Sequence, residues 1–247
     1  MQLGNKVVIV TGGASGIGGA ISRVLVARGA KVVAVDVNGK AGEALEGELG
    51  SNVQFLLGDV SDRTVAETAV ELASERFGGL DGLVNNAHAS AQAMFNDLTE
   101  DQWELSFNTG FRATRQFMAA AYPLLARNGG AVVNFGSGSA MVGQETQAAY
   151  ASAKEAIRGL SRVTANEWAK DDIRVNVVSP MALTPGVKAW SEAYPQMYQD
   201  SLAKVPLGRF GDPEEDVAPI VAFLLSDDSR YMTGQTLMAD GGANKLY

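Results

Sequence analysis

The sequence lacks cysteine altogether and contains a single histidine, His88. Disulfides and thiolate metal sites are therefore excluded, and carboxylates are the only plentiful metal ligands, which argues against a zinc enzyme. Positive charge is also scarce, because 20 Lys and Arg residues face 28 Asp and Glu residues and the net charge is −8. That sign is wrong for a general binder of nucleic-acid phosphates or anionic membranes. We therefore expect no nucleic acid and no membrane as partners.

Long hydrophobic runs are absent too. No stretch approaches the length that spans a bilayer, and the first ten residues lack the regions of a signal peptide, so we expect a cytoplasmic protein. The 247 residues are 46% hydrophobic and 19% charged, a globular composition that excludes disorder as the main state. Because there is no repeat and no linker-like change in composition, residues 1–247 are expected to form a single domain.

Short runs rich in Val, Ile and Leu alternate with longer amphipathic or Ala-rich segments. This alternation predicts an α/β fold, a doubly wound parallel sheet of about seven strands with helices on both faces. The predicted strands are 6–11, 31–36, 53–58, 82–85, 131–136, 173–179 and 236–239. The predicted helices are 16–28, 39–49, 62–77, 100–127, 148–170 and 212–225. The segment at about 181–209 is irregular, and we expect short helices and a specialised substrate loop there.

A glycine-rich segment from Thr11 to Gly18 follows the first predicted strand and opens the first predicted helix. Glycine permits positive φ and lets the backbone approach a diphosphate, whose charge suits the N–H groups at a helix start. A turn required only for packing is the alternative. Asp36 ends the second predicted strand, where a carboxylate can accept hydrogen bonds from ribose hydroxyls, and the combination favours a dinucleotide site.

Asp36 also indicates which dinucleotide binds. A carboxylate repels a ribose phosphate, whereas Arg or Lys would attract it. Neither Ala14 and Ser15 in the glycine segment nor Val37 and Asn38 after the strand supplies a cation. We therefore predict NAD as the cofactor. For Asp59, after the third predicted strand, two roles remain open: capping of the following turn and contact with the adenine edge.

Tyr150 and Lys154 are four residues apart and so lie on one face of a predicted helix. Alone, that spacing is typical of an amphipathic boundary with solvent. Ser137 lies 13 residues before Tyr150, at the end of a predicted strand. Because the carboxyl ends of the strands gather around the ligand crevice in a doubly wound sheet, Ser137 and Tyr150 are expected to converge there.

These motifs resemble those of the short-chain dehydrogenase/reductase family over essentially the whole chain. The matching residues are Thr11 to Gly18, Asp59, Asn85-Asn86-Ala87, Asn108, Ser137, Tyr150 to Lys154, Pro180, Thr184 and Asp240-Gly241-Gly242. The resemblance implies a Rossmann-type enzyme, often a homotetramer. Such an enzyme oxidises an alcohol or reduces a ketone, a small-molecule substrate, with a nicotinamide cofactor.

The resemblance also implies roles for single residues. Tyr150 acts as general base in oxidation and acid in reduction, while Lys154 and the oxidised nicotinamide supply positive charge that favours its phenolate. Ser137 holds the substrate oxygen. Asn108 positions a water next to Lys154, or else only stabilises an interrupted helix. The expected cofactor contacts are Gly12, Ser15, Gly16, Ile17, Gly18, Asp36, Asp59, Val60, Asn86, Ala87, Tyr150, Lys154, Pro180 and Thr184. For Thr184, ordinary loop capping is the alternative.

Two residues depart from the family pattern, because His88 and Met181 stand where glycine is common. Both add side-chain volume beside the expected nicotinamide. His88 either titrates near neutral pH and donates to substrate, or is a neutral, hydrogen-bonded wall residue.

The irregular segment carries Trp190, Tyr194, Met197 and Tyr198 at helix-like spacing. These side chains either pack a short helix onto the body or line a pocket, and a lined pocket favours a hydrophobic or aromatic alcohol or ketone. The expected substrate contacts are His88, Ser137, Met141, Gln144, Tyr150, Met181, Trp190 and Tyr194. We therefore expect an NAD-dependent alcohol dehydrogenase. A 3-oxoacyl or steroid-type ketoreductase and a non-catalytic dinucleotide-binding scaffold are the alternatives.

Overall fold

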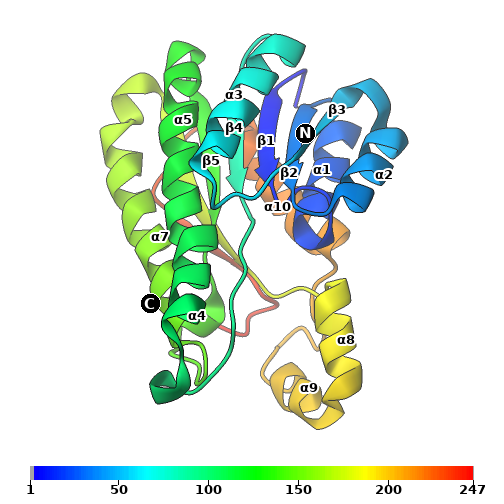
Figure 1. Ribbon diagram of the computed structural model, residues 1–247, viewed down its shortest axis with the longest axis vertical. Helices are drawn as coiled ribbons and strands as arrows, with labels where there is room; N and C mark the ends of the chain where they lie inside the picture. The colour runs from blue at the N-terminus through cyan, green and yellow to red at the C-terminus, as the bar shows by residue number, and fades with distance from the viewer. Residues whose placement is uncertain (1–2, 247) are drawn as a thin grey trace.

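The computed structural model describes residues 3–246, and it places a seven-stranded parallel sheet between two layers of helices (Figure 1). The strand order is β3-β2-β1-β4-β5-β6-β7. The predicted doubly wound α/β fold is confirmed. The strands are β1 Val7–Thr11, β2 Lys31–Asp36, β3 Val53–Leu57, β4 Gly82–Asn85, β5 Gly130–Phe135, β6 Ile173–Pro180 and β7 Thr236–Ala239.

The helices follow the predicted segments, with interruptions. Their bounds are α1 Gly16–Ala27, α2 Gly39–Leu49, α3 Arg63–Phe77, α4 Glu100–Ser106, α5 Ala113–Asn128, α6 Gly138–Met141, α7 Ala148–Glu167, α8 Pro185–Ala193, α9 Pro195–Leu202 and α10 Ala218–Leu225. The predicted helix 100–127 is wrong as one α-helix, because a π-helical turn, Phe107–Arg112, separates α4 from α5. The predicted helix 212–225 likewise begins as a π-helical turn, Pro213–Val217, before α10.

The sheet is buried on both faces, and successive residues of β1 show how. Val8 and Val10 belong to the core cluster under α1 and α10, whereas Val7 and Ile9 belong to the cluster under α3, α5 and α7. Side chains of a strand alternate between the two faces of the sheet, so each strand contributes to both clusters. This packing explains why the strands read as continuous apolar runs in the sequence.

The carboxyl ends of the strands form the edge that carries the glycine segment, Ser137 and the other motifs of the sequence analysis. Between β1 and β4 the direction of strand order reverses, and ligands of open α/β sheets bind in the crevice at such a point. The helices α8 and α9 stand off from the sheet as a pair at the same end of the molecule as α4 (Figure 1).

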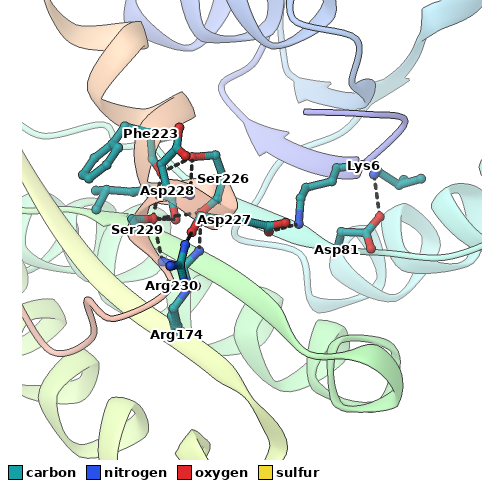
Figure 2. A network of polar contacts seen from close by, with 11 residues as sticks. Lys6, Asp81, Arg174, Phe223, Ser226, Asp227, Asp228, Ser229 and Arg230 are labelled. Carbon is teal, nitrogen blue, oxygen red and sulfur yellow. Dashed lines mark hydrogen bonds and ion pairs between the residues drawn. The ribbon is translucent and has the colours of Figure 1, made fainter. Parts of the chain in front are cut away.

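A separate polar network holds the amino ends of the strands (Figure 2). Arg174 of β6 donates to Ser229 Oγ (2.9 Å) and to the Ser226 carbonyl (3.1 Å). Lys6, which precedes β1, pairs with Asp227 at 3.0 Å. The network therefore fixes the turn after α10 to β1 and β6, at the edge opposite to the glycine turn.

Candidate active site

The turn between β1 and α1 brings glycines to the carboxyl edge of the sheet. Gly12 and Gly16 have φ values of +61° and +53°, which L side chains rarely adopt. A methyl group on Gly18 would overlap the Gly12 carbonyl and the Asn86 amide, so glycine is required there for close packing. Ser15, the N-cap of α1, forms no side-chain capping bond. The first N–H groups of α1 thus have no capping side chain, and the turn is suited to an anion such as a diphosphate.

Asp36 lies at the end of β2, in a cavity of about 580 Å³ that also includes the glycine turn. Its side chain is 8% exposed and accepts hydrogen bonds from the N–H groups of Ala14 (3.1 Å) and Asn38 (3.0 Å). None of the described residues that line this cavity is Lys or Arg. The cavity therefore has an acidic end without a compensating cation.

Asp59 and Val60 line the same cavity beyond β3. The Asp59 carboxylate accepts from the Ser61 N–H at 2.8 Å, and its side chain is exposed. Asp59 therefore caps the following turn and still faces the cavity, so the two roles left open by the sequence are compatible. Val60 is buried in the core cluster under α3.

Asn86 and Ala87 connect the end of β4 to the glycine turn. The Asn86 side chain donates to the carbonyls of Thr11 (3.0 Å) and Gly12 (3.3 Å). Thr11 Oγ1 in turn accepts from the backbone N–H groups of Asn86 (3.0 Å) and Ala87 (3.1 Å). These bonds hold the floor of the cavity rigid at the reversal of strand order.

A second cavity, of about 370 Å³, adjoins the first and shares Ile17, Asn86, His88 and Thr184 with it. Ser137 follows β5, and Tyr150 and Lys154 lie one turn apart on α7, so the three converge in this cavity. Lys154 Nζ donates to the Phe135 carbonyl (3.0 Å) and lies 5.7 Å from the centroid of the Tyr150 ring.

Burial governs the protonation of this group. Burial lowers the pKa of Lys154 to about 7, and the side chain is 4% exposed. Burial also raises the pKa of Tyr150, and a hydrogen bond with Ser137 acts in the opposite direction. The neutral phenol is therefore favoured in the free protein, and the expectation that Lys154 and the oxidised nicotinamide together favour the phenolate stays a prediction.

Ser137 is part of a short chain of hydroxyl and amide groups. Its Oγ lies 2.8 Å from Ser139 Oγ, and Ser139 donates to Gln147 Oε1 at 2.7 Å. Gln147 is the N-cap of α7, the helix that carries Tyr150. The loop after β5 is thereby connected to the start of that helix.

His88 forms the wall between the two cavities. Its ring centroid lies 4.9 Å from that of Tyr150, and its Nε2 lies 2.9 Å from Ser106 Oγ. Burial, together with the charge of Lys154, lowers the pKa of His88 to about 2. The ring is therefore neutral near pH 7, as in the second of the two interpretations of this residue.

Asn108 lies in the π-helical turn, which packs against α7. Its Oδ1 accepts from Arg112 Nη1 at 2.6 Å, and the residue does not line either cavity. The side chain is thus engaged within its own interrupted helix. It makes no hydrogen bond to Lys154.

The segment 181–209 forms α8 and α9. Trp190 packs on Tyr198 (6.3 Å between ring centroids), and Tyr198 packs on Phe210 (5.1 Å). Tyr194 is 56% exposed. Thr184 accepts from the Val187 N–H at 3.2 Å as the N-cap of α8, and it also lines both cavities.

Most of the expected site residues line one of the two cavities. Those that line neither are Gly18, Asn108, Met141, Gln144, Trp190 and Tyr194. Nine residues that we did not expect also line the second cavity: Phe135, Gly136, Gly138, Ser139, Ala182, Val187, Phe210, Asp240 and Asn244. Asp240 belongs to one of the motifs that match the family, but no local pattern in the sequence shows that this motif reaches Ser137.

The described part of the chain contains no group of three or more His, Cys, Asp or Glu side chains that could hold a metal ion. Within residues 3–246, the helices are also too short or too polar to cross a bilayer.

Comparison with known proteins identifies similar chains along almost the whole length. Residues 12–244 match the family model described as enoyl-(acyl carrier protein) reductase. A 12alpha-hydroxysteroid dehydrogenase from Clostridium sp. is 42% identical, with 96% of each chain covered. The 3-oxoacyl-[acyl-carrier-protein] reductase FabG of Thermotoga maritima is 36% identical, with 98% of this chain and 99% of the relative covered.

A solved structure is similar as well. It is a crystal structure from Sinorhizobium meliloti 1021, described as a short-chain alcohol dehydrogenase, with a TM-score of 0.92 and 32% identity. The match covers 98% of this chain and 97% of that chain.

Proposed function

Since the chain belongs to the short-chain dehydrogenase/reductase family, an oxidoreductase family, we propose that it interconverts a secondary alcohol and a ketone with NAD(H). The observation that carries this proposal is the convergence of Ser137, Tyr150 and Lys154 in a cavity that adjoins the acidic cleft at Asp36. A scaffold without turnover would have no need of a buried lysine beside a buried tyrosine, since burial of both groups is costly.

The residues present fit a nicotinamide dinucleotide. Gly12 and Gly16 leave room for a diphosphate at the start of α1, and Asp36 has the position to accept from ribose hydroxyls. When bound, the dinucleotide supplies the hydride chemistry. NAD is proposed over NADP because of the Asp36 carboxylate and the lack of Lys or Arg among the described lining residues.

The reacting groups of the chain have distinct proposed roles. Tyr150 removes the proton from the alcohol oxygen in oxidation and returns it in reduction. Ser137 holds that oxygen by a hydrogen bond. Lys154 lies close enough to Tyr150 to favour the phenolate when it is protonated. We assign Asn108 the support of the π-helical turn against α7.

The proposed substrate is a hydrophobic or aromatic secondary alcohol or its ketone. Ile17, Phe135, Val187 and Phe210 give the second cavity apolar walls, and Lys154 is its only cation among the described lining residues. That arrangement provides little for the phosphate of an acyl carrier. A steroid alcohol is a second candidate, because the relative with 42% identity is named as a hydroxysteroid dehydrogenase.

We also propose that the protein is a cytoplasmic homotetramer. Each chain would form one catalytic domain, with 181–209 as its substrate segment. The resemblance to the family supports the assembly, and the lack of cysteine agrees with the compartment.

The test is NADH formation and consumption with a panel of secondary alcohols and ketones. Tyr150→Phe should lower turnover at least about 100-fold, because proton transfer by a positioned side chain contributes that much or more. NADH binding, followed by fluorescence, should change little. Tyr231→Phe is the matched control, because Tyr231 is fully exposed. Normal turnover by Tyr150→Phe would overturn the catalytic assignment, and a wild-type protein that binds no dinucleotide would overturn the function.

A further inference from the structure

The turn after β7 reaches into the second cavity. Asp240 and Asn244, which belong to this turn, line the cavity together with Ser137 and Tyr150. A methyl group on Gly138, the residue after Ser137, would overlap the Asn244 amide. The Asn244 side chain therefore lies directly against the loop that carries the reacting serine.

Asp240 fixes the orientation of the Asn244 amide. The carboxylate is 4% exposed, and its oxygens accept from the Gly242 N–H (3.0 Å), the Asn244 N–H (2.8 Å) and Asn244 Nδ2 (3.0 Å). An ionised carboxylate only accepts hydrogen bonds, so the amide atom that faces it must be the NH₂ group. The carbonyl oxygen, Oδ1, is thereby left on the other side.

Asn244 Oδ1 is available to a ligand. It accepts no hydrogen bond from any residue that the structure describes, and it belongs to a half-buried side chain and is not itself completely buried. Most of the other polar groups of this wall are already occupied. Ser139 bonds Ser137 and Gln147, and the Asp240 carboxylate accepts the three bonds just described.

We propose that Asn244 is a specificity-determining residue that accepts a hydrogen bond from a second hydroxyl or N–H group of the substrate. This inference rests on the proposed function and deepens it. The preferred substrate is then a hydroxyketone, or the matching diol, in which the second group lies near the reacting carbon and the remainder is apolar. The oriented amide provides the acceptor, and the walls formed by Ile17, Phe135 and Phe210 provide the apolar surface.

The experiment compares substrates that differ by one hydroxyl group. Acetoin is paired with 2-butanone, and 2-hydroxycyclohexanone with cyclohexanone, and the ratio of kcat/KM within each pair is measured with NADH. Wild type should favour the hydroxylated member. Asn244→Ala should lower the ratio about 3- to 10-fold, the effect of one neutral hydrogen bond. Asn244→Leu keeps the branched shape of the side chain without its acceptor and should lower the ratio equally, whereas Asn166→Ala, at an exposed asparagine of α7, should leave it unchanged.

The outcomes separate the two proposals. An unchanged ratio in both Asn244 variants would overturn the inference, because the acceptor would then have no effect on substrate choice. A ratio that falls only in Asn244→Ala would also overturn it, because the loss of side-chain volume rather than the loss of the acceptor would then be responsible. A wild-type protein that binds no dinucleotide and reduces no ketone would overturn the proposed function, and the inference with it. If the wild-type protein turns over ketones and both Asn244 variants lower the ratio, the proposed function and the inference are both supported.

Discussion

Burial, rather than pairing with opposite charge, sets the protonation of the bases in the second cavity. The pKa of Lys154 falls to about 7 and that of His88 to about 2. Near pH 8 the free protein therefore holds both groups largely neutral, and the phenol of Tyr150 has no strong cation beside it. In the proposed reaction, ionisation of Tyr150 would then depend on positive charge that the cofactor supplies, which would couple catalysis to cofactor binding.

Asp36 carries the proposed preference for NAD, and its replacement tests that role. Asp36→Ala removes the charge that repels a ribose phosphate and an acceptor for the ribose hydroxyls. The ratio of kcat/KM with NADP to kcat/KM with NAD should rise about 10- to 100-fold. Asp59→Ala is the matched control, because Asp59 lines the same cavity from the next strand but bonds its own turn. If both variants keep the wild-type ratio, Asp36 does not discriminate.

Single residues of the site were predictable where the chain itself brings them together. Tyr150 and Lys154 share a helix face, and Ser137 ends a strand, so spacing and topology were sufficient. Asn244 was not predictable, because its contact with Gly138 joins two loops more than 100 residues apart. The hydrogen-bond partner of His88 was not predicted either, because Ser106 lies on a different element, α4.

At the scale of elements, the strands were predicted well because both faces of the sheet are buried and each strand is a plain apolar run. The π-helical turn at Phe107–Arg112 was missed, since an i→i+5 turn leaves almost no mark on an apolar periodicity. The aromatic residues of 181–209 indicated short helices. Their spacing did not show that Trp190 and Tyr198 pack on each other outside the cavity.

The π-helical turn and the wall of the site are connected through Gly110. A methyl group there would lie 2.7 Å from His88 Cε1 and 2.9 Å from Nδ1, so the turn has no space for a side chain while the ring is present. Gly110→Ala should lower the free energy of unfolding by about 1–3 kcal/mol, the usual cost of overpacking. Because His88 lies against Tyr150, kcat should fall as well.

A double-mutant cycle isolates that contact. In a His88→Gly background the added methyl group meets open space, so Gly110→Ala should cost at least about 1 kcal/mol less there than in wild type. Gly47→Ala is the matched control, because Gly47 is an exposed helical glycine with no atom within 4 Å of an added Cβ. Both measurements use urea denaturation. Equal costs of Gly110→Ala in the two backgrounds would refute the contact.

For the whole molecule, the sequence predicted the layers and the site-bearing edge, since strands that alternate with helices leave few topologies. The sequence did not predict that burial lowers the pKa of Lys154. Lys154 is an ionisable side chain buried inside the folded chain, and burial lowers its pKa to about 7. Its titration therefore contributes to the pH dependence of the stability of the entire fold.

The direction of that dependence follows from the two pKa values. Lys154 titrates at its ordinary 10.5 in the unfolded chain and at about 7 in the fold. Between these values the unfolded chain binds one more proton, so the contribution of Lys154 to the free energy of unfolding rises with pH, by up to about 1.4 kcal/mol per unit. Below pH 7 both states are protonated and the cost of burial is fully present. Above 10.5 it is gone.

Lys154→Met removes this titration and keeps an apolar chain of similar length in the same place. Without cofactor, the variant should be more stable than wild type at pH 6–7, and its advantage should shrink steadily towards pH 10. Urea denaturation across that range measures the difference, in which the other titrating groups cancel. Lys188→Met, at an exposed lysine of α8, should show no such trend. If the stability advantage of Lys154→Met stays constant with pH, the folded protein does not lower the pKa of Lys154 to about 7.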